Sequence, residues 1–116
     1  DYSFQSGISA ARQLLDRPDR PTAVFCISDV LAMGAIRAAG GLGIRVPEEL
    51  SVVGFDDVEY ATMMNPMLTT VSQPLYPLGK TSARMLIDQI ESGEGMGKIF
   101  LEHKLVIRDS TAQLEP

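Results

Sequence analysis

A short apolar run that ends in two carboxylates is the feature that most constrains the fold. Residues 51–57 read Ser-Val-Val-Gly-Phe-Asp-Asp, so a continuous hydrophobic stretch leads directly into Asp56 and Asp57. Such a stretch is typical of a strand covered on both faces, and Gly54 permits close packing against its backbone. The two acids would then lie at the carboxyl end of the strand, where open α/β sheets bind ligands.

A second apolar stretch, Thr22–Ile27, repeats this arrangement and is expected to be a central parallel strand. It is followed by Ser28-Asp29 and by a predicted helix over Val30–Ala39, so that strand, helix and strand form a right-handed βαβ unit. Ser28 or Asp29 can cap the helix, and a plain cap is the favoured interpretation for Asp29. Ser28 and Val30 would border the same crevice as Asp56. Gly40 and Gly41 are expected to end the helix with positive φ.

The remaining elements complete an α/β pattern with a parallel sheet. Each is predicted from its apolar spacing and from the Pro, Gly and Ser residues that bound it. They are a helix within Asp1–Leu15 capped by Ser3 or Ser6, a short helix over Val58–Met64, a strand over Leu68–Ser72, a helix over Pro77–Glu91, a Gly-rich loop over Ser92–Gly97, one or two strands within Ile99–Ile107 and a tail over Thr111–Pro116.

Length and charge exclude several classes of protein. The 116 residues, 45% hydrophobic and 22% charged, suit one small domain or a piece of a larger protein. A net charge of -5 without a Lys/Arg run argues against binding nucleic acid through phosphates by this chain alone. No apolar run approaches the roughly 20 residues that span a bilayer, and no signal peptide opens the chain. The single Cys26 cannot form an internal disulfide and so favours a reducing compartment.

The residue types at Asp56 and Asp57 leave their role open. Ionised carboxylates accept hydrogen bonds from sugar or ribose hydroxyls, but a turn-and-cap pair is equally compatible, and a metal or acid/base role is the weakest alternative. One acid can face a ligand while the other faces the backbone. His103 is the only histidine, and neither a nucleophile motif nor zinc-ligand spacing accompanies it. We therefore expect no catalytic site, no metal site and no cofactor.

Four blocks of sequence, in order, resemble the LacI/purine-repressor family. Residues 22–35 resemble its strand and "N/S-D-x-x-A-x-G-A" helix, and residues 43–57, Gly-Ile-Arg-Val-Pro-Glu-Glu-Leu-Ser-Val-Val-Gly-Phe-Asp-Asp, resemble its most diagnostic stretch. Residues 65–74 with Leu78-Gly79 resemble the next block, and residues 105–111, Leu-Val-Ile-Arg-Asp-Ser-Thr, resemble its usual ending. The resemblance covers essentially the whole chain.

This resemblance implies a cytoplasmic bacterial transcription regulator and not an enzyme. Its effector domain would have the periplasmic-binding-protein type I fold, with two α/β lobes around a cleft and helices on both faces of each sheet. The chain would comprise part of the C-terminal lobe (1–74), a crossover helix that packs on the other lobe (75–92), and the final strands and tail (93–116). Without its partner lobe, the apolar face of the crossover helix is expected to contact another chain, since an isolated helix of this length is marginal in water.

The resemblance also implies partners and site residues. The effector would be a small sugar or a nucleoside- or purine-like metabolite, with Asp56 contacting it and Tyr2 stacking on its ring. The protein would form a homodimer, bind operator DNA through a helix-turn-helix domain outside this chain, and have no membrane partner. The remaining implied positions are Ser28, Val30, Gln73 and Leu75 in the cleft and Met33 and Met64 in the dimer interface, although core filling is the better interpretation of the methionines from the sequence alone.

Two other functions compete with this interpretation. A periplasmic sugar-binding protein of the same fold would lack the DNA-binding domain, and residues 46–57 favour the regulator over it. A small α/β hydrolase or kinase fragment could use Asp56 as a base. The missing nucleophile and phosphate-binding motifs argue against this second alternative.

Overall fold

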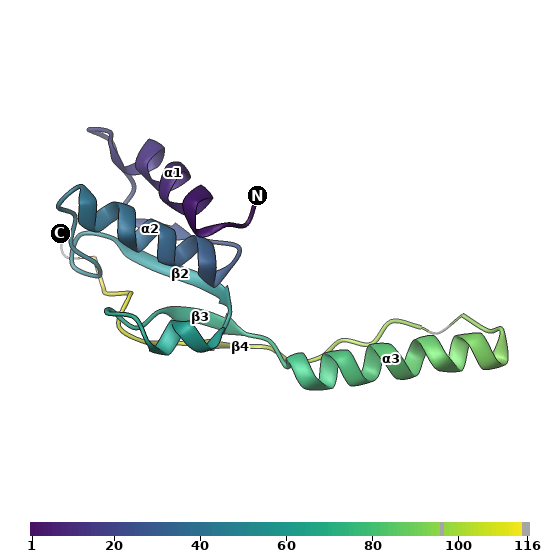
Figure 1. The fold of residues 1–116 in the computed structure, drawn as a ribbon. Helices are drawn as coiled ribbons and strands as arrows, with labels where there is room; N and C mark the ends of the chain where they lie inside the picture. The colour runs from purple at the N-terminus through teal and green to yellow at the C-terminus, as the bar shows by residue number, and fades with distance from the viewer. Residues whose placement is uncertain (96, 115–116) are drawn as a thin grey trace. The chain divides into compact units, whose positions relative to one another are not determined.

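Two structural units make up the chain in the computed structural model, which describes residues 1–95 and 97–114 (Figure 1). Unit 1 comprises Asp1–Ser72 and Leu105–Pro116, and unit 2 comprises Gln73–Lys104. Met96 in the predicted Gly-rich loop and the last two residues of the predicted tail lie outside the described residues.

The sheet has the strand order β1-β2-β3-β4. β1 pairs with β2 in parallel, and β2 pairs with β3 in parallel, as the predicted βαβ unit requires. The expectation that β1 is central was wrong for the described chain, because β1 lies at the edge of this sheet and Phe25 is 61% exposed. Apolar residues show that a strand favours burial but not which element covers it. The strands are β1 (Ala23–Phe25), β2 (Ser51–Asp56), β3 (Thr69–Ser72) and β4 (Lys104–Val106).

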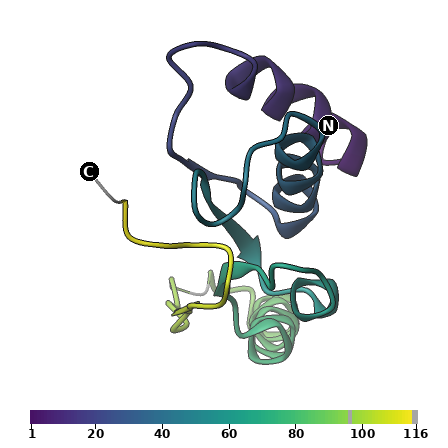
Figure 2. The same cartoon turned by 90° about the vertical axis from the view of Figure 1, so that its left-hand side faces the viewer.

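Two helices, α1 (Phe4–Leu15) and α2 (Asp29–Gly41), cover one face of this sheet (Figures 1 and 2). α1 begins as predicted, because the Ser3 side chain accepts a hydrogen bond from the Ser6 backbone N–H. The helices meet at two glycines. A Cβ at Gly7 would lie 2.6 Å from the Leu31 carbonyl oxygen, and a Cβ at Gly34 would lie 2.6 Å from that of Phe4. The two backbones therefore pack in direct contact.

The core lies between these helices and the sheet. Along β2, Val52 and Gly54 are buried while the other residues of the strand are only partly covered. On β1 and β2, Phe25 and Phe55 contact each other edge to face with ring centroids 6.5 Å apart. The buried apolar residues are Ala11, Leu15, Ala32, Ala35, Ala38, Ala39, Ile44, Leu50, Val52, Ala61 and Leu68.

Two boundaries differ from the sequence predictions. Gly40 and Gly41 were expected to end α2 with positive φ, but the helix runs through both and the positive φ of 73° falls at Gly43. The cause is that the Leu42 N–H still bonds to the Ala38 carbonyl, so the helical ladder continues past the glycines. The short helix predicted over 58–64 is a 3₁₀ turn, η1 (Glu59–Thr62).

Unit 2 is built on one long helix, α3 (Leu75–Ser92), which starts two residues before the predicted Pro77. None of its residues is buried, and Leu86, Ile87 and Ile90 are 53–74% exposed. One or two strands were expected within Ile99–Ile107, and among the described residues this range contains β4 alone. Within the described ranges, no helix is long and apolar enough to cross a bilayer. Contact between α3 and another chain stays a prediction.

Candidate functional site

The turn after β2 brings the two predicted acids to the carboxyl end of the sheet. Asp56 is the last residue of β2 and pairs with Ser72 of β3, and Asp57 follows it. Both have positive φ, 113° at Asp56 and 57° at Asp57. For residues other than glycine, such conformations cost about 1–3 kcal/mol each and persist only where surrounding contacts fix them. Contacts from two sides hold this turn.

Arg108 holds the turn from the C-terminal segment. Its guanidinium Nη2 lies 2.7 Å from Asp57 Oδ1, and the two side chains are only 15% and 21% exposed. Nη1 donates to the Leu68 carbonyl at 3.0 Å, and the Arg108 backbone N–H donates to Thr69 Oγ1 at 2.9 Å. Asp57 thus has a structural partner in the interior, a role that the sequence had left open.

Asp29 holds the turn from the other side. Its carboxylate is fully buried and accepts hydrogen bonds from the Val58 backbone N–H at 2.8 Å and the Thr70 hydroxyl at 2.6 Å. Its position in the first turn of α2 places the charge at the favourable end of the helix dipole. The side chain joins the start of α2, the turn after β2 and the middle of β3.

The favoured interpretation of Asp29 as the helix cap was wrong. Ser28 is the cap, and its Oγ accepts a hydrogen bond from the Leu31 N–H at 3.3 Å, while Asp29 is the first helical residue. The physical reason is that the buried carboxylate is already satisfied by Val58 and Thr70. The predicted close approach at Gly54 is confirmed, because a Cβ there would overlap Asp29 Oδ1.

Three of the predicted effector residues lie at this edge of unit 1. Ser28 and Asp56 each stand three residues beyond the register pair formed by Phe25 and Val53, so Ser28 after β1 and Asp56 at the end of β2 belong to the same edge of the sheet. Val30 is half-buried in the first turn of α2. Tyr2 is 68% exposed, and the N-terminus lies at the end of unit 1 toward which β2 points (Figure 1). Gln73 and Leu75 belong to unit 2, and their role stays a prediction.

Sequence reasoning missed three residues that build this edge. Thr70 resembles any β-branched strand residue, and Ser72 only becomes relevant through its pairing with Asp56. Arg108 lies in the block that ends the chain, but nothing in that block indicates an ion pair with a residue 51 positions earlier. These long-range contacts carry no local sequence signal.

The predicted interface methionines lie in different surroundings. Met33 on α2 is partly exposed, and Met64 packs against the core cluster. Met64 therefore fits the core-filling interpretation as well as the interface. The neighbouring Met63 is 64% exposed and Tyr60 is 62% exposed, so the residues around η1 still present an apolar surface.

Three further observations concern the side chains that could bind a metal or act as nucleophile or base. Across residues 1–95 and 97–114, no group of three or more His, Cys, Asp or Glu side chains is arranged to hold a metal ion. The half-buried Cys26 thiol has its pKa raised to about 11 by burial, so it is protonated at neutral pH and a poor nucleophile. His103 is exposed in unit 2.

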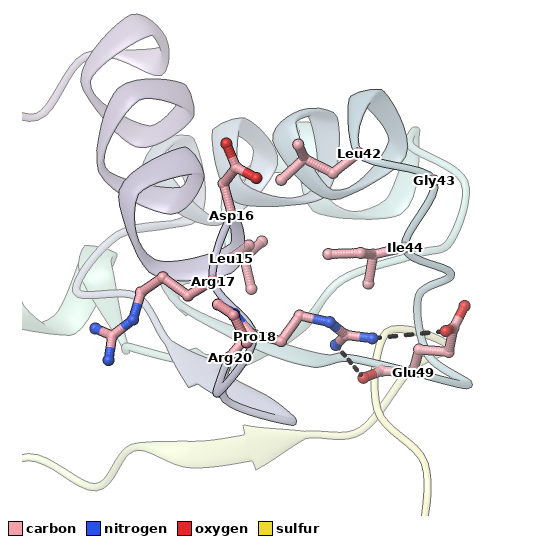
Figure 3. A pocket seen from close by; sticks show the side chains of 9 residues that line it. All are labelled: Leu15, Asp16, Arg17, Pro18, Arg20, Leu42, Gly43, Ile44 and Glu49. Atoms are coloured by element: carbon pink, nitrogen blue, oxygen red, sulfur yellow. Dashed lines mark hydrogen bonds and ion pairs between the residues drawn. The ribbon is translucent and has the colours of Figure 1, made fainter.

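A concavity lies at the end of unit 1 opposite to this edge, where β1 and β2 begin. This open groove of about 480 Å³ contains none of the predicted site residues (Figure 3). Arg20 crosses it to Glu49, donating to the backbone carbonyl at 3.2 Å and lying 3.5 Å from Oε1. Arg45 contacts the other carboxylate oxygen at 2.9 Å and holds the pKa of Glu49 below its usual value. These contacts secure the connection before β2.

Comparison with known proteins places this geometry in context. Residues 1–111 match the family described as periplasmic binding protein-like domain. The HTH-type transcriptional repressor CytR of Escherichia coli is 44% identical over 115 residues, which cover 98% of this chain and 34% of that protein. The repressor PurR of Yersinia enterocolitica is 48% identical, covering 97% and 33%. The chain thus spans about a third of the length of these curated relatives.

A solved relative has the same fold and carries a ligand. It is a LacI family transcriptional regulator from Enterococcus faecium with bound ribose, 35% identical, with a TM-score of 0.83 over 99% of this chain and 42% of that one. The chain therefore shares the fold of the matching part of that regulator.

Proposed function

This chain belongs to the periplasmic binding protein-like domain family, and we propose that it is the effector-binding and dimerisation part of a LacI-type transcriptional regulator. The similarity to two transcriptional repressors over nearly the whole chain supports this role. We propose that the effector is a sugar or a nucleoside- or purine-like metabolite. The ribose bound by a relative of the same fold supports that class.

The observation that carries the proposal is the position of Asp56. It ends β2 at the carboxyl edge of a parallel sheet, where ligands of such folds bind, in a turn fixed by Arg108 and Asp29. A carboxylate there can accept hydrogen bonds from two hydroxyls of a sugar ring. We propose that the other contacts come from Tyr2, Ser28, Val30, Gln73 and Leu75.

The proposed activity is binding without turnover. The effector acts only through a difference in its affinity for two arrangements of the protein, and this difference changes DNA binding elsewhere in the molecule. Operator DNA would be read by a helix-turn-helix domain that is not part of the described chain, inside the bacterial cell. The absence of bond making is tested by recovering the bound compound unchanged after prolonged incubation.

The first experiment is the intact mass and N-terminal sequence of the natural gene product. A product about three times this length, as the covered share of the relatives indicates, with an N-terminal helix-turn-helix segment supports the regulator. A cleaved export signal without that segment would move the assignment to solute uptake.

The effector class is then tested by calorimetric titration of the natural product with D-ribose, the common ribonucleosides and the purine bases. We expect one of these to bind, and we expect Asp56→Asn to weaken its affinity by roughly tenfold or more, since a charge-assisted hydrogen bond is lost. The matched control is Glu48→Gln, which neutralises an exposed acid away from the edge. Unchanged affinity of Asp56→Asn would contradict the site.

We also propose that the faces carrying Met33 and Met64 form the homodimer interface. Met33→Glu places a charge on the partly exposed methionine without disturbing the core position of Met64. Sedimentation equilibrium of the natural product should shift from dimer toward monomer. A dimer of unchanged strength would contradict this interface.

A further inference from the structure

The ion pair between Arg108 and Asp57 joins two segments of unit 1 that are distant in sequence. The chain leaves unit 1 after Ser72 and returns at Leu105, so Arg108 lies on the returning segment. Asp57 directly follows Asp56, the proposed effector contact. One contact of 2.7 Å thus links the returning segment to the turn that bears the site.

Arg108 is itself held in place by two further hydrogen bonds, so its guanidinium can fix the position of the turn. Its second guanidinium nitrogen donates to the Leu68 carbonyl, and its backbone N–H donates to Thr69 Oγ1, both at the beginning of β3. Because the ion pair is largely buried, solvent and salt screen it less than a surface pair. A charge-assisted contact of this kind is both strong and directional.

The turn itself needs such an anchor. Asp56 and Asp57 both have positive φ, a conformation that is unfavourable for residues other than glycine. The hydrogen bond from the Val58 N–H to Asp29 fixes the residue after the turn, and the β2–β3 pairing fixes Asp56 against Ser72. Arg108 contacts Asp57, the residue between them.

We propose that Arg108 is a positioning residue of the effector site, which holds Asp57 and so maintains the turn from which Asp56 presents its carboxylate. The inference rests on the proposed function only in naming Asp56 as the effector contact. Its consequence is that effector affinity depends on the conformation of the segment that returns to unit 1. A change in that segment alters the site without any contact between the segment and the effector.

The test compares Arg108→Gln with Ser110→Ala in the natural gene product. Ser110 lies on the same segment and is fully buried, and its hydroxyl accepts from the Thr69 N–H and donates to the Val52 carbonyl. Ser110→Ala therefore damages the packing of the segment without touching the turn. Arg108→Lys is the conservative variant, since it keeps the charge but not the forked geometry.

Two readouts separate positioning from general stability. NMR couplings report φ at Asp56 and Asp57, and hydrogen exchange reports the protection of the Val58 N–H, both at temperatures well below unfolding. Calorimetric titration with D-ribose and the common ribonucleosides reports affinity. We expect Arg108→Gln to shift the couplings, to speed Val58 exchange and to weaken affinity by roughly tenfold or more.

The controls have defined outcomes. Ser110→Ala should keep the couplings and affinity of the wild type, and Arg108→Lys should restore part of both. Unchanged couplings in Arg108→Gln overturn the proposal, as do shifted couplings with unchanged affinity. If the wild type binds none of these compounds, the proposed effector class fails, and the couplings alone then decide whether Arg108 holds the turn.

Discussion

Unit 1 and unit 2 use the same kind of helix in different ways. α1 in unit 1 buries Ala11 and Leu15 along one face, whereas α3 in unit 2 also has an apolar face but no buried residue. Unit 1 also buries polar groups, including Asp29 and Thr70, and each of these has a hydrogen-bond partner. Helical spacing predicts that a face favours burial, but only the presence of a partner element decides whether it is buried.

This difference between the units predicts that the buried polar contacts of unit 1 contribute most to the free energy of unfolding. Asp29→Ala should have the largest effect, because it leaves the Val58 N–H and the Thr70 hydroxyl without their acceptor. Each unsatisfied buried group costs about 1–3 kcal/mol, so for the two groups we expect a loss of roughly 2–6 kcal/mol in the free energy of unfolding by urea.

Asp29→Asn serves as the matched control for that loss. An amide oxygen can still accept from the Val58 N–H, and the Thr70 hydroxyl can turn to accept from the amide nitrogen. The loss should then be clearly smaller than for Asp29→Ala. Equal losses in the two variants would show that the carboxylate charge, and not its hydrogen bonds, stabilises unit 1.

Gly54→Ala should have the next largest effect. The added Cβ would overlap Asp29 Oδ1 and lie 2.9 Å from Leu68 Cδ2, so the buried carboxylate and the Leu68 side chain must move. Overpacking of this kind costs about 1–3 kcal/mol in unfolding free energy. Gly40→Ala is the control, since a Cβ there meets no atom within 4 Å and alanine favours the helix. A neutral Gly54→Ala would contradict the close approach.

These residues also show what the sequence could predict and what it could not. The apolar runs 22–27 and 51–55, the helical spacing between them and the two acids are local patterns, and they predicted the βαβ unit and the edge that carries Asp56. The partners of Asp29 and Arg108 lie 29 to 51 positions away, and no local pattern specifies them. The edge position of β1 was missed for the same reason, because its composition does not identify its neighbours.

Ile87→Ser tests the other half of the comparison. Ile87 is 53% exposed, so the substitution should change the unfolding free energy of the monomer by less than about 0.5 kcal/mol, whereas Leu68→Ala in unit 1 should cost about 2–5 kcal/mol. If the apolar face of α3 contacts another chain, as we predict, Ile87→Ser should instead weaken association in sedimentation equilibrium. A monomeric wild-type chain at high concentration would contradict that contact.

The smallest effect concerns the one thiol, and it compares the two units directly. Burial raises the pKa of Cys26 in unit 1 to about 11, so little thiolate exists at pH 8 and a disulfide reagent should react slowly with it. The reference is a chain with Cys26→Ser and Ser82→Cys, which moves the thiol to an exposed position on α3. This second thiol should react several-fold faster at pH 8, and the difference should disappear in urea. Because the pKa of Cys26 is higher in the folded protein than in the unfolded chain, folding disfavours the thiolate. Unit 1 should therefore lose some stability as pH rises from about 9 toward 11. Equal reaction rates of the two thiols in the folded chains would show that the segment directly after β1 is as accessible to solvent as the surface of α3.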